Sequence, residues 1–184
     1  AAQSPVATLY RQAAMQRHNV HRANHGAGPV TWSAKLERAA MKSAQRCTFG
    51  HFMNENGLTY GQNLALGLPA NKIAAIISDQ WYYNEVGAFS GNYGDAQPDY
   101  GSDMQDFEKW GHFTQLVWKD SVKIGCATWR CNSIATSEDD ATPLPSSYGG
   151  DITYCNYKSE GNFAGEYAAN VGAPRSNVKV KANS

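Results

Sequence analysis

Two histidines and one acidic residue stand where they could carry chemistry. His112 opens the stretch 111–119, GHFTQLVWK, whose other positions are mostly apolar or aromatic. An imidazole in that position can point into a cleft while the apolar residues pack behind it. His51 follows a glycine soon after Cys47, and Glu85 ends a segment rich in Trp and Tyr. The three side chains therefore lie at the ends of expected elements, where they could converge.

These residue types suggest a metal centre. Two histidines and one carboxylate form a known catalytic zinc set that leaves one position open for water. A metal-assisted hydrolase or peptidase at His51, Glu85 and His112 is one hypothesis, and Zn or Mg bound at the two histidines without catalysis is another. The sequence has no H-E-x-x-H helix and no Ser or Cys nucleophile in an obvious setting. Binding is therefore favoured over catalysis, and no catalytic residue is assigned.

Helices and strands must position these groups. Apolar periodicity predicts helices over 5–22, from Ser33 to about Cys47, and over 71–86. A carboxylate such as Glu85 on an apolar helix needs a partner that offsets its desolvation, unless it lies exposed at the helix end. Residues 48–70 are expected to be rich in loops.

Three strands are expected in the second half of the chain. Alternation predicts strands over 122–130 and 152–157, and a third strand is expected after residues 161–165. Helices and strands mix without regular βαβ alternation, which indicates an α+β or α/β/α sandwich with a mainly antiparallel sheet. Residues 1–184 are expected to form one domain, with 173–184 as a flexible tail.

Three further histidines, His18, His21 and His25, lie close together at the end of the first expected helix and just after it. The i, i+3 spacing of the first two would allow a metal site. No carboxylate or thiol lies near them in the sequence, so we expect surface and capping histidines.

A long segment over residues 87–110 is rich in glycine, acidic residues and aromatic rings. Long loops in compact domains are usually functional or mobile. The rings could cover core surface or grip an apolar ligand. The candidate lipid-binding residues are Phe89, Tyr93, Tyr100, Phe107 and Trp110.

Composition limits the classes of partner. The 16 basic and 16 acidic residues give a net charge of zero, which argues against nucleic acid, because phosphate binding requires a basic excess. No apolar run approaches the roughly 20 residues that a membrane helix needs. The chain starts AAQSP, without a basic or apolar leader segment, so we expect a mature, secreted chain.

The four cysteines also favour a secreted protein. They form an even set without C-x-x-C spacing, which indicates two disulfides in an oxidising environment and leaves three pairings open. The cysteines are Cys47, Cys126, Cys131 and Cys155.

Four stretches resemble the CAP superfamily, which includes cysteine-rich secretory, antigen 5 and pathogenesis-related 1 proteins. GHFTQLVWKDS (111–121) is similar to the first family signature and ITYCNYKSEGNF (152–163) to the second. HNVHRANHG (18–26) resembles the sequence motif of the family's first helix, and YGQNLA (60–65) resembles that of its central loop. The ending GNFAGEYAANVGAP looks most like the fungal secreted branch.

The resemblance implies a three-layer α-β-α sandwich with a central cleft that holds two His and two acidic side chains. His51, Glu85 and His112 match three of these positions, whereas the fourth, a Glu in the family, is Gln62 here. Gln cannot ionise and offers a neutral carbonyl in place of an anionic ligand. The family pattern also implies the disulfides Cys47–Cys131 and Cys126–Cys155.

Function follows as an expectation from the same resemblance. The leading hypothesis is a secreted protein that sequesters or exports sterols or fatty acids, with sterols held by the aromatic loop. A second family mode places a fatty acid between two helices, here the first helix and the one that begins near His112. The alternatives are an effector or defence protein recognised by a host or receptor protein, and the metal-dependent hydrolase described above.

Overall fold

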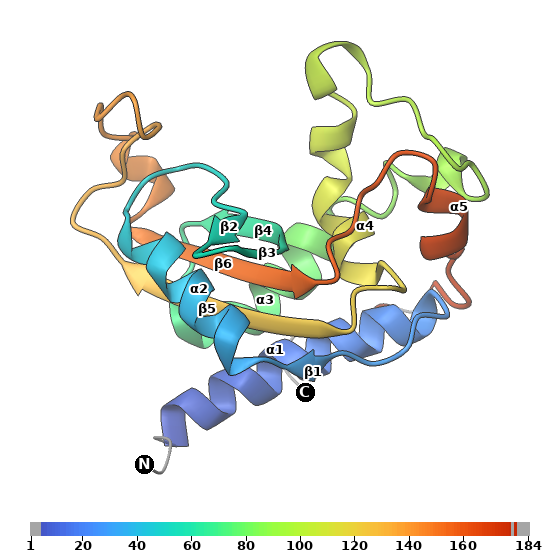
Figure 1. Cartoon of the computed structure of the whole chain (residues 1–184), viewed down its shortest axis with the longest axis horizontal. Helices are drawn as coiled ribbons and strands as arrows, with labels where there is room; N and C mark the ends of the chain where they lie inside the picture. Colours follow the sequence, from blue (N-terminus) through green and yellow to red (C-terminus); the bar gives the residue numbers. More distant parts are fainter. Residues whose placement is uncertain (1–4, 178, 180–184) are drawn as a thin grey trace.

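Figure 1 shows the computed structural model, which describes residues 5–177 and residue 179. The principal helices are α1 (Pro5–Asn24), α2 (Ala34–Gln45), α3 (Ile73–Ala75), α4 (Gly111–Val117) and α5 (Tyr167–Asn170). The strands are β1 (Thr31–Trp32), β2 (Asn54–Glu55), β3 (Leu58–Thr59), β4 (Gly61–Leu66), β5 (Lys123–Arg130) and β6 (Asp151–Lys158). The short helical turns are η1 (Ala70–Lys72), η3 (Ser90–Asn92), η4 (Ser102–Met104), η5 (Phe107–Lys109) and η6 (Ser146–Tyr148). Helix α3 continues as the π-helical segment η2 (Ile76–Tyr83).

The main sheet has the strand order β1-β5-β6-β4. Strands β4, β5 and β6 pair antiparallel, whereas the short edge strand β1 pairs parallel with β5. The sheet is therefore mixed rather than mainly antiparallel. A separate hairpin is formed by β2 and β3.

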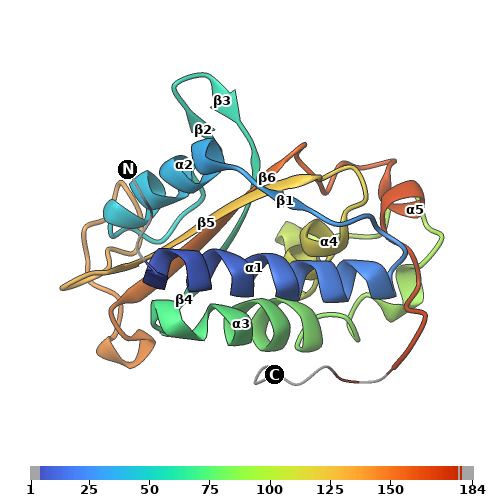
Figure 2. The ribbon, with the colours of Figure 1, turned by 90° about the horizontal axis from the view of Figure 1, so that it is seen from below.

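Helices cover both faces of the sheet, which gives the expected three layers. Helix α2 packs on one face, against β5 and β6, while α1, η2 and α4 contact one another on the other side (Figure 2). Ser33 caps α2 as predicted, because its hydroxyl accepts a hydrogen bond from the backbone N–H of Leu36. The fold class expected from the sequence, an α+β three-layer sandwich, is confirmed.

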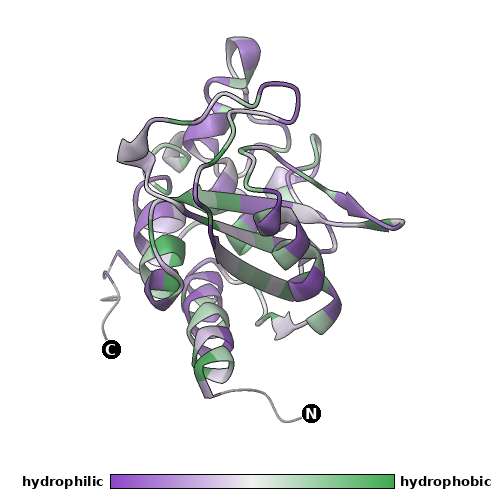
Figure 3. Cartoon of the chain, turned by 90° about the vertical axis from the view of Figure 1, so that its left-hand side faces the viewer, coloured by the Kyte–Doolittle hydropathy of each residue, from purple (hydrophilic) through white to green (hydrophobic). Residues whose placement is uncertain are grey.

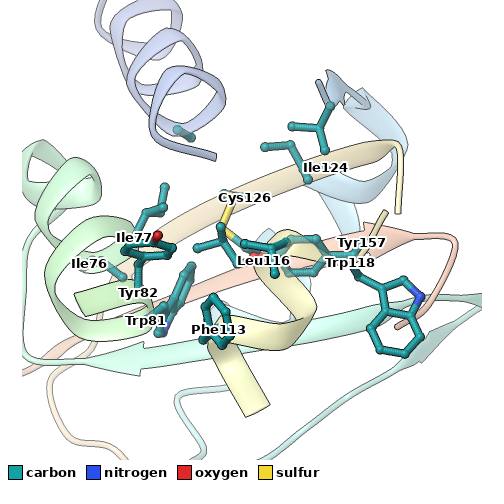
Figure 4. Packing of buried hydrophobic residues seen from close by; sticks show 14 of the residues in the cluster. Ile76, Ile77, Trp81, Tyr82, Phe113, Leu116, Trp118, Ile124, Cys126 and Tyr157 are labelled. Atoms are coloured by element: carbon teal, nitrogen blue, oxygen red, sulfur yellow. A yellow bond between two sulfur atoms is a disulfide. The ribbon is translucent and has the colours of Figure 1, made fainter. Parts of the chain in front are cut away.

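The larger core cluster lies between the sheet and the α1 side. Figure 4 shows Trp81 and Phe113 packed near Leu116, with Ile124 and Tyr157 supplied by the strands. All five side chains are buried. Large aromatic rings dominate this cluster, and rings of this size contribute much of the apolar area that a core buries.

The two disulfides have the pairing that the family resemblance implied. Cys47–Cys131 connects the end of α2 to the end of β5 across 84 residues of sequence. Cys126–Cys155 joins two residues that lie directly opposite each other on β5 and β6. The expected pairing is confirmed, and it leaves no free cysteine in the chain.

The three histidines in α1 and just after it contradict the expectation of surface residues. His18, His21 and His25 are all buried. His18 Nε2 lies 2.8 Å from the Tyr157 hydroxyl, His21 Nε2 lies 2.8 Å from Ser78 Oγ, and His25 Nε2 lies 2.8 Å from the hydroxyl of Tyr82. Each imidazole has a polar partner in the core, which offsets part of its desolvation and explains why it can be buried.

Residues 48–70 are rich in loops, and they also contain the β2–β3 hairpin and β4, which the sequence did not predict. The strand expected after residues 161–165 is absent from the described chain, which forms α5 there. Residues 172–177 lie against α1, where the Asn24 side chain bonds both the N–H and the carbonyl of Ser176. The rest of the expected tail, residue 178 and residues 180–184, lies outside the described residues.

The helices contain both hydrophobic and hydrophilic residues (Figure 3). Within the described ranges, none of them is long and apolar enough to cross a membrane.

Replacing Gly125 by Ala is expected to destabilise the fold by about 2 kcal/mol, as overpacking in a core does. A Cβ atom there would lie 2.1 Å from the backbone N of Glu37 and 2.6 Å from the carbonyl carbon of Leu36, so α2 would have to move off the sheet. Guanidinium unfolding measures the loss. Gly87→Ala is the matched control, because nothing lies within 4 Å of its Cβ position. Equal stability of the two variants would contradict the close approach of α2.

Candidate functional site

An open cleft of about 930 Å³ lies beside β4, the edge strand of the sheet. Every residue of β4 lines it, together with the 49–53 loop, the start of α4 and the turn that contains Tyr148. His51, Gln62 and His112 all line the cleft, and Glu85 is hydrogen bonded to His112. The structure thus brings together the four positions that the sequence selected.

Glu85 is buried and holds the start of α4 in place. One of its oxygens lies 2.7 Å from His112 Nδ1, and the other accepts a hydrogen bond of 2.9 Å from the backbone N–H of Phe113. The π-helical turns of η2 place Glu85 there, after Trp81, whose ring stacks on His112. The buried carboxylate thus has the partner that its desolvation requires, and this partner is an imidazole.

His51 stands at the mouth of the cleft, in the loop that follows the Cys47 disulfide. Its Nδ1 lies 3.2 Å from Gln62 Oε1. Desolvation by the walls of the cleft lowers the pKa of His51, the hydrogen bond to Gln62 raises it, and the nearby His112 lowers it further. These effects favour the neutral imidazole at pH 7.

The residues around the cleft do not fit a metal held by the protein. Among the described residues, no three His, Cys, Asp or Glu side chains gather closely enough to hold an ion. Both oxygens of Glu85 accept hydrogen bonds from α4, and Gln62 is neutral. A Zn or Mg ion would find two imidazole nitrogens and would take its other ligands from water. We therefore derive no chemical step through a metal.

The candidate lipid-binding rings separate into two groups. Phe89 and Trp110 are buried in the core and pack edge to face, with ring centroids 5.2 Å apart. Tyr93 and Tyr100 are half-buried and pack against the same core. Only Phe107 among the five lines the cleft. For the other four, this placement favours the alternative that the segment covers core surface.

Sequence reasoning missed the exposed apolar residues of the cleft mouth. Phe49, Met53 and Tyr148 line the cleft, and 43%, 53% and 51% of their surfaces are exposed. They come from loops without periodicity that are about 95 residues apart. The Cys47–Cys131 disulfide and the bridge between Thr48 and Ala135 hold these loops together. No local pattern could have signalled this meeting.

A second, smaller groove of about 480 Å³ is lined by α1, by η2 and by Pro174, Ser176 and Asn177. This groove is not the one expected from the sequence, which would lie between the first helix and the helix that begins near His112. The side chains that line the groove include His21, Tyr82 and Tyr83.

Comparisons with known proteins agree with this fold. A probable pathogenesis-related protein of Arthroderma benhamiae is 39% identical over 90% of this chain and 50% of its own length. The secreted protein RBT4 of Candida albicans is 35% identical over 68% of this chain and 32% of its own length. The chain thus spans half or less of these fungal relatives. A crystal structure of NaASP2 with Zn²⁺ superposes with a TM-score of 0.57 and 21% identity, over 93% of this chain and 88% of that one.

The family model of the cysteine-rich secretory proteins, CAP, matches residues 15–157. This range includes both disulfides and all four cleft positions. The chain belongs to the cysteine-rich secretory protein (CAP) family.

Proposed function

We propose that this protein is a secreted carrier that binds a small lipid, a sterol or a fatty acid, in the cleft beside β4. The observation that carries the proposal is the division of the cleft lining. Phe49, Met53 and Tyr148 supply exposed apolar surface, while His51 and His112 supply polar groups to the same lining. A cleft of about 930 Å³ lies within the range of small-molecule sites, which combine apolar walls with a few polar groups.

The energetics are favourable for such a ligand. Burying on the order of 300 Å² of apolar ligand surface contributes roughly 7 kcal/mol, from which the entropy lost on association is subtracted. The two imidazoles can then orient the head group of the lipid. Secretion is supported by the two disulfides and by the relative RBT4, whose name describes a secreted protein.

Binding is a better match to the lining than hydrolysis. None of the described residues that line the cleft is a Ser, Thr, Cys or Lys that could act as a nucleophile beside His112. Zn²⁺ is named with the structure of NaASP2, but here the fourth position is Gln62 and the donor set is incomplete.

The variant Phe49→Ser/Tyr148→Ser is expected to weaken sterol binding at least tenfold, because it removes two apolar walls of the mouth. The assay is saturation binding of radiolabelled cholesterol, and separately of a long-chain fatty acid, to the purified, oxidised protein. Val122→Ser/Trp129→Ser is the matched control, since these residues are 49% and 41% exposed and lie outside the cleft.

The control variant is expected to bind like the native protein. Equal weakening in both variants would show non-specific adsorption and contradict a site in the cleft. Absence of saturable binding of either lipid to the native protein would overturn the proposed function.

A further inference from the structure

Strand β4 forms an edge of the main sheet, and all of its residues line the cleft. Its strand neighbour is β6. An edge strand presents backbone N–H and C=O groups that no neighbouring strand bonds. In an antiparallel ladder, opposite residues alternate between hydrogen-bonded and non-hydrogen-bonded pairs. The register therefore identifies which residues of β4 direct these groups away from β6.

A hydrogen bond at the end of the ladder gives the direction of each residue. The N–H of Gly67 donates to the carbonyl of Asp151, which lies opposite it when the register is continued by one residue. Gly67 therefore belongs to a hydrogen-bonded pair. By alternation, the N–H and C=O groups of Gln62, Leu64 and Leu66 turn away from β6.

Two further hydrogen bonds support this direction. The carbonyl of Leu64 accepts a hydrogen bond of 3.2 Å from the indole N–H of Trp81, which lies on η2 and outside the sheet. On the other side of β6, the N–H of Cys131 donates to the carbonyl of Gly150. The next residue of β6, Asp151, is then turned away from β5 and towards β4, as the bond to Gly67 requires.

The outward backbone groups of β4 are largely without partners. Apart from the carbonyl of Leu64, those of Gln62, Leu64 and Leu66 form no hydrogen bond with a described residue. They recur at every second residue, at intervals of about 6.8 Å. The backbone of another extended chain carries donors and acceptors at the same interval, whereas a lipid carries its polar atoms at one end. This edge therefore matches a peptide strand.

Both ends of β4 are closely flanked by other elements. A Cβ atom at Gly67 would meet the carbonyl oxygen of Tyr148, and one at Gly61 would meet the side chain of Gln115 on α4. The strand between them has six residues, which corresponds to roughly 20 Å. A flexible extended segment fits such a site. The edge strand of a second folded copy would bring its own neighbouring elements against these flanks.

The side chains of an added strand would point alternately towards two sets of cleft residues. The set from the loop after α2 and from η6 is apolar and comprises Phe49, Met53 and Tyr148. The set from η2, η5 and α4 is mainly polar and includes Gln80, Glu108 and His112. Glu108 supplies a negative charge, because the neighbouring Lys109 is paired with Asp106 instead. A basic side chain would complement this second set.

We propose that the free edge of β4 binds an extended segment of another protein as an added strand, with apolar side chains at alternate positions and basic side chains between them. Main-chain hydrogen bonds to Gln62, Leu64 and Leu66 supply affinity, and the two sets of cleft side chains supply selectivity. The inference goes beyond the proposed function, because a lipid can bind to the apolar lining without using the strand edge.

The probe is the blocked heptapeptide Thr-Val-Lys-Val-Arg-Val-Thr, in which valines and cations alternate. Calorimetric titration of the protein at pH 7, without lipid, measures its binding. Two versions carry N-methyl groups, either at the first two valines or at Lys and Arg. Alternate N–H groups of a strand point to the same side, so we expect one version to bind at least tenfold more weakly and the other to bind like the parent.

Nuclear magnetic resonance places the peptide on the protein. We expect Overhauser contacts between the peptide and the backbone protons of Leu64 and Leu66, with downfield shifts of these two amide protons. The amide protons of Asn63 and Ala65 already bond to β6 and should shift less. A peptide with Glu in place of Lys and Arg should bind at least threefold more weakly, because it meets Glu108 with the same charge.

Other results would overturn the added strand. These are no binding at one millimolar peptide, equal affinity of the two N-methylated versions, or contacts without shifts at Leu64 and Leu66. Equal or stronger binding of the acidic peptide would overturn the basic partner. A dimer in sedimentation that the peptide dissociates would assign the edge to a second copy instead. None of these measurements uses a lipid, so their failure is separate from a failure of the proposed function.

Discussion

Lowering the pH from 7 to 4 is expected to reduce the free energy of unfolding by about 6 kcal/mol. Burial lowers the pKa of His18 to about 4 and that of His21 to about 3. The charge of the neighbouring Arg17 lowers the pKa of His21 further, and burial also lowers that of His25. The unfolded chain takes up these protons near pH 6.5. The stability is therefore fully present above pH 6.5 and is lost as the pH falls towards the folded pKa values, at about 3 kcal/mol for each of the first two residues.

Guanidinium unfolding followed by Trp fluorescence at pH 7, 6, 5 and 4 measures this loss. His21→Gln should remove about half of the slope, because glutamine keeps a polar partner for Ser78 and does not titrate. If this variant does not fold, the ring proton resonances of the native protein give the same information. Resonances from the α1 histidines that titrate near pH 6.5 would contradict their burial as neutral groups.

Breaking the Cys47–Cys131 disulfide by a double alanine substitution is expected to cost about 4.6 kcal/mol. The two residues are separated by 84 positions, and the entropy that a cross-link removes from the unfolded chain grows with the logarithm of loop length. The same relation gives about 3.6 kcal/mol for Cys126–Cys155, whose residues are 29 positions apart. Chemical unfolding of the oxidised variant at pH 7 measures the loss.

A reducing agent provides the control for this prediction. It should destabilise the native protein, which has two disulfides, more than the variant, which retains only Cys126–Cys155. A loss of less than about 1 kcal/mol in the variant would mean that contacts already restrict the unfolded chain near Cys47. The cleft should also lose its shape, because this bond holds the loops of Phe49 and Tyr148 near each other.

The sequence allowed the helices, two of the long strands and the need of Glu85 for a partner to be predicted, because each depends on local periodicity or on a buried charge that must be offset. Strand β4 was missed for a physical reason. Gln62 and Asn63 are polar but buried, and their side chains donate hydrogen bonds to residues of β6. The sequence of this strand therefore shows no alternation of polar and apolar residues. A pattern based on hydrophobicity cannot detect a strand whose burial is polar.

The histidines of α1 show the same limit. His18 and His21 are polar in any hydropathy pattern, yet they face Tyr157 and Ser78, which lie 139 and 57 positions away. Only the three-dimensional arrangement supplies these partners. The mouth of the cleft likewise depends on two loops that are distant in sequence, and residue types within either loop do not reveal the other.

The loop of His51 is joined to the sheet through the Gln62 amide, and this connection has a consequence for measurement. The N–H of Phe52 bonds to the same oxygen that faces His51. Thermodynamic linkage requires that a ligand which binds the ordered loop more tightly also suppresses its local opening. The rate at which the Phe52 amide exchanges with deuterium should therefore fall as the cleft fills. One backbone proton would then report occupancy without a labelled ligand.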